Sequence, residues 1–240
     1  MRRMAIIITE PDATASLRLL SWFSPAFPTG SFSYSHGLEW VVETGDVRDR
    51  ATLVDWLADV VVHGALWCDG LFFCAAHRAA VPTFDPPSLL ETAELAAAFR
   101  GTSELALEAS AQGRAFLTGI LAGWPHPLLE EARDLLAADS LTPALPWSAG
   151  VACGVHGIPL DQGLLAFAHA SVATLVNAGV RLVPLGQSDG LLALAALEPL
   201  VRSTVERACA AGLDDLGSAA LGVDLASMAH ETQYTRLFRS

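Results

Sequence analysis

Hydrophobic residues recur at helical spacing along almost the whole chain. Between residues 51 and 66 they fall three and four positions apart and line one helix face, while Asp55 and Asp59 lie on another. Asp49, just before this stretch, is expected to cap the helix. No strand is marked by alternating residues or by a hairpin dipeptide, and only the segment 5–9 could be extended. The pattern predicts an all-α fold, a single-domain bundle of about eight to ten helices.

Proline, glycine and acidic residues divide this pattern into successive helices. Ser88 and Glu91 have the spacing of a capping box after two prolines, so a helix is predicted over 86–101. A second helix over 102–121 follows a tight break, and we expect the two to form an antiparallel pair. CGVH, residues 153–156, is typical of a short apolar helix rich in small residues.

Three more helices are expected in the second half of the chain. The stretch 161–182 starts at Asp161 and is apolar on nearly all sides, which predicts the central, buried helix. Pro199 is expected to kink the next helix, over 188–210, or to mark its first turn. The last helix is predicted over 213–231.

Composition excludes two classes of partner. The chain has 240 residues, a net charge of −12 and 14 basic residues, all of them arginine, so a nucleic-acid-binding protein is not expected. Hydrophobic residues make up 52%, but the longest charge-free stretches, 140–160 and 162–180, are interrupted by prolines or polar residues. We therefore expect no membrane span. The apolar excess indicates a buried helix and protein–protein interfaces.

The predicted organisation has three parts. Residues 1–12 are expected to form a flexible N-terminal arm, because their apolar run is too short for a secretory signal. Residues 13–230 are the all-helical domain, and residues 231–240 are a partner-docking C-terminal tail. The four cysteines form no CxxC motif and are expected to be free, buried thiols, which favours a cytoplasmic protein.

Motifs for catalysis are missing from the sequence. It contains no GxxxxGK[ST], GxSxG or HExxH motif, so we expect a protein that is not an enzyme. An alternative stays open, a helical metal-dependent enzyme with a buried site of Cys153, His156 and His169. Apart from that alternative, His230, beside Glu231 near a helix end, is the histidine that we consider as a metal ligand. A generic helical adaptor is a third hypothesis.

Two stretches have the composition of recognition surfaces. The loop 24–40, SPAFPTGSFSYSHGLEW, is rich in proline, glycine, serine and aromatic residues, and Ser33 or Ser35 could cap a helix whose Leu38 and Val41 face inward. In the tail, HETQYTRLFRS, arginine and aromatic residues recur three and four positions apart. Such residues dominate interface energetics, so we expect the tail to bind a partner. Because the tail has too little apolar surface to fold by itself, we expect it to be mobile in the free protein and ordered on that partner.

These same stretches carry a family resemblance. The loop 24–40, the following GDV, RLVPLGQSDG at 181–190 and the tail lie in the order found in the urease accessory protein UreF family, which the chain resembles over nearly its whole length. The resemblance implies an all-helical homodimer that bridges a UreD/UreH-like protein and the GTPase UreG on apo-urease, so that the dinickel centre is built. It implies no stably bound cofactor and leaves nickel in transit as an open question.

Residues of these motifs are the candidate partner contacts. Tyr34 and Glu39 are expected to lie on the surface, where alanine substitution would leave the fold unchanged. Arg236 is expected to be the main anchor of the tail. The full set of candidates is Ser33, Tyr34, His36, Gly37, Glu39, Arg181, Gln187, Glu231, Gln233, Tyr234, Arg236, Leu237, Phe238 and Arg239.

Overall fold

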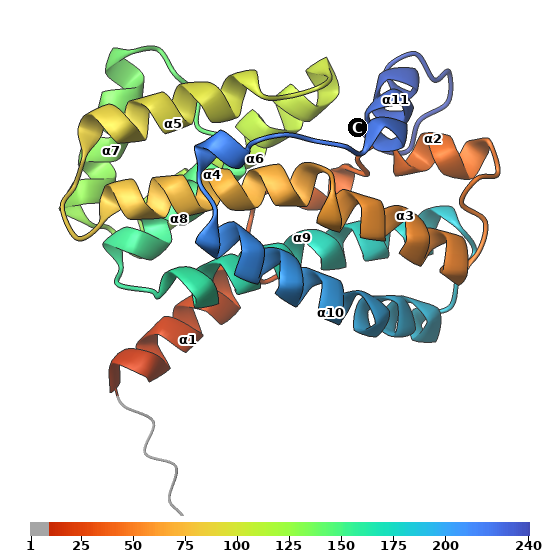
Figure 1. Cartoon of the computed structure of the whole chain (residues 1–240), viewed down its shortest axis with the longest axis horizontal. Coiled ribbons are helices and arrows are strands. Elements are labelled where there is room, and N and C mark those ends of the chain that lie inside the picture. The colour runs from red at the N-terminus through yellow and green to blue at the C-terminus, as the bar shows by residue number, and fades with distance from the viewer. Residues whose placement is uncertain (1–9) are drawn as a thin grey trace, which may run out of the picture.

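The computed structural model describes residues 10–240, in which all regular structure is helical. Ten helices of ten residues or more agree with the predicted number, and α2 adds a six-residue helix. Figure 1 shows them as one bundle. The helices are α1 (Glu10–Trp22), α2 (Leu38–Glu43), α3 (Arg50–Val62), α4 (Ala65–Ala80), α5 (Pro86–Ala98), α6 (Ser103–Gly123), α7 (Pro127–Ala138), α8 (Leu145–Val155), α9 (Leu160–Leu182), α10 (Gln187–Ala210) and α11 (Leu221–His230). Short 3-10 turns cover Ser31–Ser33 and Leu213–Asp215.

The predicted N-terminal arm falls mostly outside the described residues. Residues 1–9 are not described, and residues 10–12 form the start of α1, which begins at Glu10.

The centre of the bundle is the pair α4 and α8, not the predicted 161–182 helix. Every residue of α8 from Pro146 to Gly154 is buried. A Cβ at Gly150 would lie 2.4 Å from the carbonyl oxygen of Phe73, so only glycine allows the two helices to approach this closely. In contrast, α9 leaves side chains such as Leu165 exposed. The prediction that this helix is central and buried is therefore wrong. Its outer face is apolar but exposed, and composition alone does not show which side of a helix is covered.

Local signals placed some helix starts correctly and others wrongly. The last helix begins at Leu221 rather than at Leu213, and the residue at the cap position of α2 is Gly37 rather than Ser33 or Ser35. Asp49 caps α3 as predicted, accepting a hydrogen bond from the backbone N–H of Thr52 (2.9 Å). At α5 the cap is Asp85 rather than Ser88, because the two prolines fit the first turn, where no N–H partner is needed. Asp161 lies inside the first turn of α9, which begins at Leu160.

The predicted helix over residues 51–66 is broken in two. Helix α3 ends at Val62 and α4 begins at Ala65. The carbonyl oxygen of His63 is free for the backbone N–H of Ala219 (2.8 Å), which approaches from the far end of the chain. Long-range pairing therefore replaces the helical hydrogen bonds that local periodicity favoured.

By length and composition alone, two segments could cross a membrane. They are residues 50–80 and α9. The fold buries 61% and 50% of their most apolar windows, and the first segment contains the α3–α4 break. Core helices of a bundle have these properties too.

Candidate functional site: the docked C-terminal segment

Helix α11 lies against α2 near the C-terminal end of the chain, as Figure 1 shows. Their contact depends on Gly37, which precedes α2 with a φ of +75°. A Cβ there would lie 2.7 Å from the backbone nitrogen of Ser227 in α11. Gly37, predicted as a partner contact, thus has a packing role within the chain. Leu38 and Val41 face inward, as predicted.

Glu39 is the residue on which the tail is fixed. Its side chain lies in the interior and the residue is 8% exposed. The backbone N–H groups of Leu237 and Phe238 donate to its two carboxylate oxygens, at 2.6 and 2.8 Å. The expectation that Glu39 is a surface contact is therefore wrong. It is a buried structural acid, because the tail that returns over it supplies the donors that a buried carboxylate needs.

His230, the predicted metal ligand, is fully buried between two acids. Its Nδ1 lies 2.6 Å from Glu104 and its Nε2 lies 3.2 Å from Glu39. An ionised carboxylate only accepts hydrogen bonds, so a ring nitrogen facing one must donate, whereas a metal ligand needs a free lone pair. Over residues 10–240, no group of three potential ligands is placed to hold a metal ion. The geometry favours a structural role for His230.

Two further acids on α6 complete the attachment of the tail. The guanidinium of Arg236 donates to Glu104. Glu108 accepts from the hydroxyl of Ser240 (2.6 Å) and pairs with Nε2 of His36 (2.8 Å). Burial lowers the pKa of His36, but the Glu108 carboxylate outweighs this, so that the pKa lies above its ordinary value.

One feature of the sequence marks these two acids. Glu104 and Glu108 are four residues apart on one helix, and like charges at this spacing repel unless other groups compensate them. Neither acid was predicted as a site residue. Arg236, His36 and His230 provide the compensation.

Glu231 joins the last residues of α11 to the start of α6. Its Oε1 accepts from the backbone N–H (2.8 Å) and the hydroxyl (2.6 Å) of Ser103. These hydrogen bonds lower the pKa of Glu231, and the one from the Ser103 hydroxyl has the largest effect. Glu231 thus acts within the chain as a capping acid at a helix N-terminus, where negative charge is favourable.

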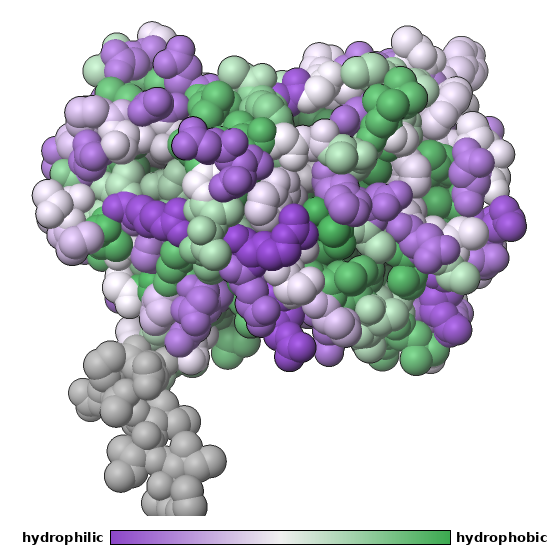
Figure 2. Space-filling view, in the orientation of Figure 1, coloured by the Kyte–Doolittle hydropathy of each residue, from purple (hydrophilic) through white to green (hydrophobic). Residues whose placement is uncertain are grey.

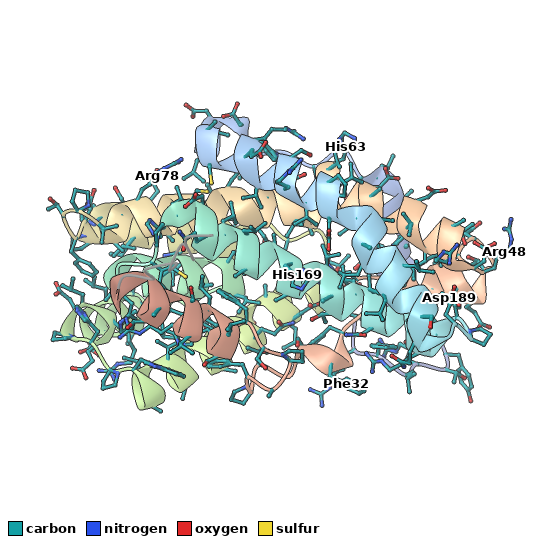
Figure 3. The ribbon with its side chains drawn as sticks, turned by 90° about the horizontal axis from the view of Figure 1, so that it is seen from below. Phe32, Arg48, His63, Arg78, His169 and Asp189 are labelled. Atoms are coloured by element: carbon teal, nitrogen blue, oxygen red, sulfur yellow. The ribbon has the colours of Figure 1, made fainter. Side chains whose placement is uncertain are left out.

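Arg181 links α9, the loop and the tail. Its guanidinium lies 3.6 Å from the ring centroid of Phe32 and 4.3 Å from that of Phe238, and it donates to the carbonyl oxygen of Phe32 (2.8 Å). Phe238 is buried, whereas Phe32 is exposed and projects from the edge of the molecule in Figure 3. Ser33 completes the link, because its carbonyl oxygen accepts from the backbone N–H of Arg239 (2.8 Å).

The tail that we expected to be mobile is thus packed against its own domain. Tyr34 is buried as well, and Gln233 is half-buried. The predicted partner contacts that stay on the surface are Gln187, Tyr234, Arg236, Leu237 and Arg239. Whether these residues bind a partner stays a prediction.

The residues of the alternative metal site do not converge. Burial raises the pKa of the Cys153 thiol, so the thiolate that a metal needs is disfavoured. His156 uses Nε2 for the carbonyl oxygen of Trp124 (3.1 Å), and burial lowers its pKa to about 4. His169 lies on α9 (Figure 3). It lines a cavity that neither Cys153 nor His156 lines. This cavity, of about 600 Å³, is largely apolar, with Phe116 and Phe167 in its wall.

Comparison with known proteins identifies the family. A family model for UreF matches residues 47–198. The chain belongs to the UreF family. It is 51% identical over 230 residues to a urease accessory protein UreF of Rhodopseudomonas palustris strain BisB5, covering 95% of this chain and 93% of that protein. It is also 51% identical to the UreF of strain HaA2, over 96% and 100% of the two chains. The UreF of Bradyrhizobium sp. strain ORS 278 is 49% identical, over 95% and 93%. As a UreF, the chain is an accessory protein in urease maturation and not an enzyme.

Proposed function

We propose that this UreF bridges a UreD/UreH-like protein and the GTPase UreG on apo-urease, in the cytoplasm, while the dinickel centre is assembled. Membership of the UreF family is the observation that carries the proposal. The missing P-loop agrees with it, because the nucleotide would then be bound by UreG.

The surface of the chain supports a role in assembly. Large apolar side chains are exposed on α1, α10, α11 and the tail, among them Leu20, Leu191, Leu221 and Tyr234. Several exposed apolar clusters on one non-catalytic chain are typical of a protein with more than one partner. A homodimer interface would cover part of this surface, and nickel would pass near the chain without being held by it.

Co-expression tests the proposal. Urease subunits and the other accessory proteins are expressed with and without this chain, and nickel content and urease activity are measured. We expect both to be low without the chain and restored with it. Full activity and nickel content without the chain would reject the proposal.

The tail is proposed to bind the UreD/UreH-like partner. Deletion of residues 234–240 is expected to abolish this binding. The helical domain is expected to stay folded but to be less stable, because Glu39 loses the N–H donors of Leu237 and Phe238. Arg236→Ala is expected to weaken binding by more than about tenfold, and Arg239→Ala is expected to weaken it less. Because Arg236 already pairs with Glu104, circular dichroism and melting must show that the variant is still folded. Unchanged affinity in all three variants would leave the tail without this role.

A further inference from the structure

Two of the four free cysteines meet where the end of α10 packs against α4. Cys74 lies on α4 and is fully buried, whereas Cys209, near the end of α10, is half-buried. The two thiols share a hydrogen bond across the helix contact. Figure 1 shows the end of α10 beside α4, and Figure 2, in the same view, shows hydrophilic side chains over this part of the surface. The pair is therefore close to solvent on the α10 side.

The two helices are held together on both sides of the pair. Gly70 lies one turn before Cys74 on the same face of α4, and a Cβ there would lie 3.2 Å from the Cβ of Ala208. Arg78 lies one turn after Cys74, and its guanidinium donates to the carbonyl oxygen of Cys209 (2.6 Å). A disulfide needs Cβ atoms about 3.5–4.5 Å apart, and helices that approach through a glycine can meet this requirement.

The environments of the two sulfur atoms differ. Burial raises the pKa of the Cys74 thiol to about 12, so Cys74 keeps its proton and donates the shared hydrogen bond. Burial also raises the pKa of Cys209, and the charge of Asp161 adds to this, but the hydrogen bond from Cys74 and the charge of Arg78 act in the opposite direction. Because Cys209 is also the more exposed of the two, its sulfur is the one that reacts first with a molecule from solvent.

We propose that Cys74 and Cys209 form a reversible disulfide with a low-molecular-weight disulfide, such as glutathione disulfide, as the oxidant. The Cys209 thiolate attacks one sulfur of the small disulfide, which releases one small thiolate and leaves a mixed disulfide on Cys209. The Sγ of Cys74 then attacks the Sγ of Cys209, the bond to the second small thiol breaks, and the proton of Cys74 passes to the leaving thiolate. Two protein thiols are thereby oxidised, and the small disulfide is reduced to two thiols.

The disulfide joins the centre of the bundle to the end of α10. Helix α4 belongs to the central pair, and α10 is followed by the turn Leu213–Asp215 and then by α11. In a reducing compartment the pair stays as thiols, and the disulfide forms as the proportion of small disulfide rises. This inference does not depend on the proposed function, because it concerns only sulfur atoms of this chain.

Oxidation of the purified full chain tests the pair. The chain is incubated with glutathione disulfide at about pH 8.5, where the thiolate fraction is larger, and is then unfolded and alkylated. Intact mass counts the remaining thiols, and peptide mapping without reduction locates any disulfide. Cys74→Ala and Cys209→Ala each remove one member of the pair. Cys68→Ala, which replaces another buried cysteine of α4, is the control. Circular dichroism and melting establish that each variant is folded.

We expect the unmodified chain and Cys68→Ala each to lose two thiols, to gain a link between the peptides that contain Cys74 and Cys209, and to regain both thiols with dithiothreitol. Cys74→Ala should accumulate the mixed disulfide on Cys209, because the second step lacks its nucleophile. Cys209→Ala should form no disulfide at Cys74.

Two results would overturn the inference, and the first needs no variant. The unmodified chain would keep all four thiols, or it would carry only a mixed disulfide and never the internal one. Equal formation of a mixed disulfide in Cys74→Ala and Cys209→Ala would show that the assigned order of the two steps is wrong.

Discussion

At the scale of single residues, the tail is held by buried acids. Glu39, Glu104 and Glu108 carry three negative charges, and Arg236, His36 and His230 face them. A buried carboxylate is stable only while donors surround it. The tail therefore supplies hydrogen-bond donors that these buried carboxylates need, and the carboxylates in turn hold the tail in place.

Glu39→Ala should detach the tail. It removes the acceptor for the Leu237 and Phe238 N–H groups and one partner of His230, which should lower the free energy of unfolding by about 2–4 kcal/mol. Hydrogen exchange of these two amides should become faster. Glu43→Ala, an exposed acid on the same helix, is the control and should change neither quantity. Equal stability and exchange in the two variants would contradict the assignment of Glu39.

His36 and His156 should respond to pH in opposite directions. Because the pKa of His36 is raised in the folded chain, its contribution to stability is present below the unfolded value of about 6.5 and is lost as pH rises through the folded pKa. For His156, with a folded pKa of about 4, stability is present above about 6.5 and is lost as pH falls. Denaturant unfolding of wild type, His36→Gln and His156→Gln between pH 5 and 9 measures both slopes. The same slope for both histidines would be inconsistent with these environments.

At the scale of secondary-structure elements, α2 and α11 can approach because one position lacks a side chain. Gly37 has a left-handed backbone, and backbone atoms of α11 occupy the space that a Cβ would need there. Gly45 also has a left-handed backbone, with a φ of +85°, but no atom lies within 4 Å of the position that its Cβ would take. The two glycines therefore separate backbone strain from packing.

Gly37→Ala should destabilise the chain more than Gly45→Ala. The left-handed backbone costs a non-glycine residue about 1 kcal/mol in both variants. The clash with Ser227 should add about 1–3 kcal/mol at Gly37 alone. Thermal unfolding of both variants measures the difference. Equal melting temperatures would mean that α11 can move away from α2 at little cost.

At the scale of the whole molecule, exposed apolar surface predicts self-association. The 25.3 kDa chain exposes apolar side chains on several helices, including Leu17 and Leu20 on α1. We expect the isolated protein to sediment at micromolar concentration with about twice the mass of one chain. A single species with the mass of one chain would contradict this.

The sequence by itself determined the helices and the family. The periodic spacing, the cap at Asp49 and the inward direction of Leu38 and Val41 follow from hydrogen bonds and contacts within a few residues, which a linear pattern can show. The motifs at residues 24–40 and 181–190 led to the correct family for the same reason, because they are contiguous in sequence.

Only the tertiary structure decided the roles of the residues in those motifs. Glu39 and Leu237 are 198 positions apart, and Glu104 and His230 are 126 apart. Whether such a charged side chain faces solvent, a partner or its own chain depends on how the helices pack around it. No local pattern encodes this, because the donors that make burial of Glu39 stable come from the opposite end of the sequence.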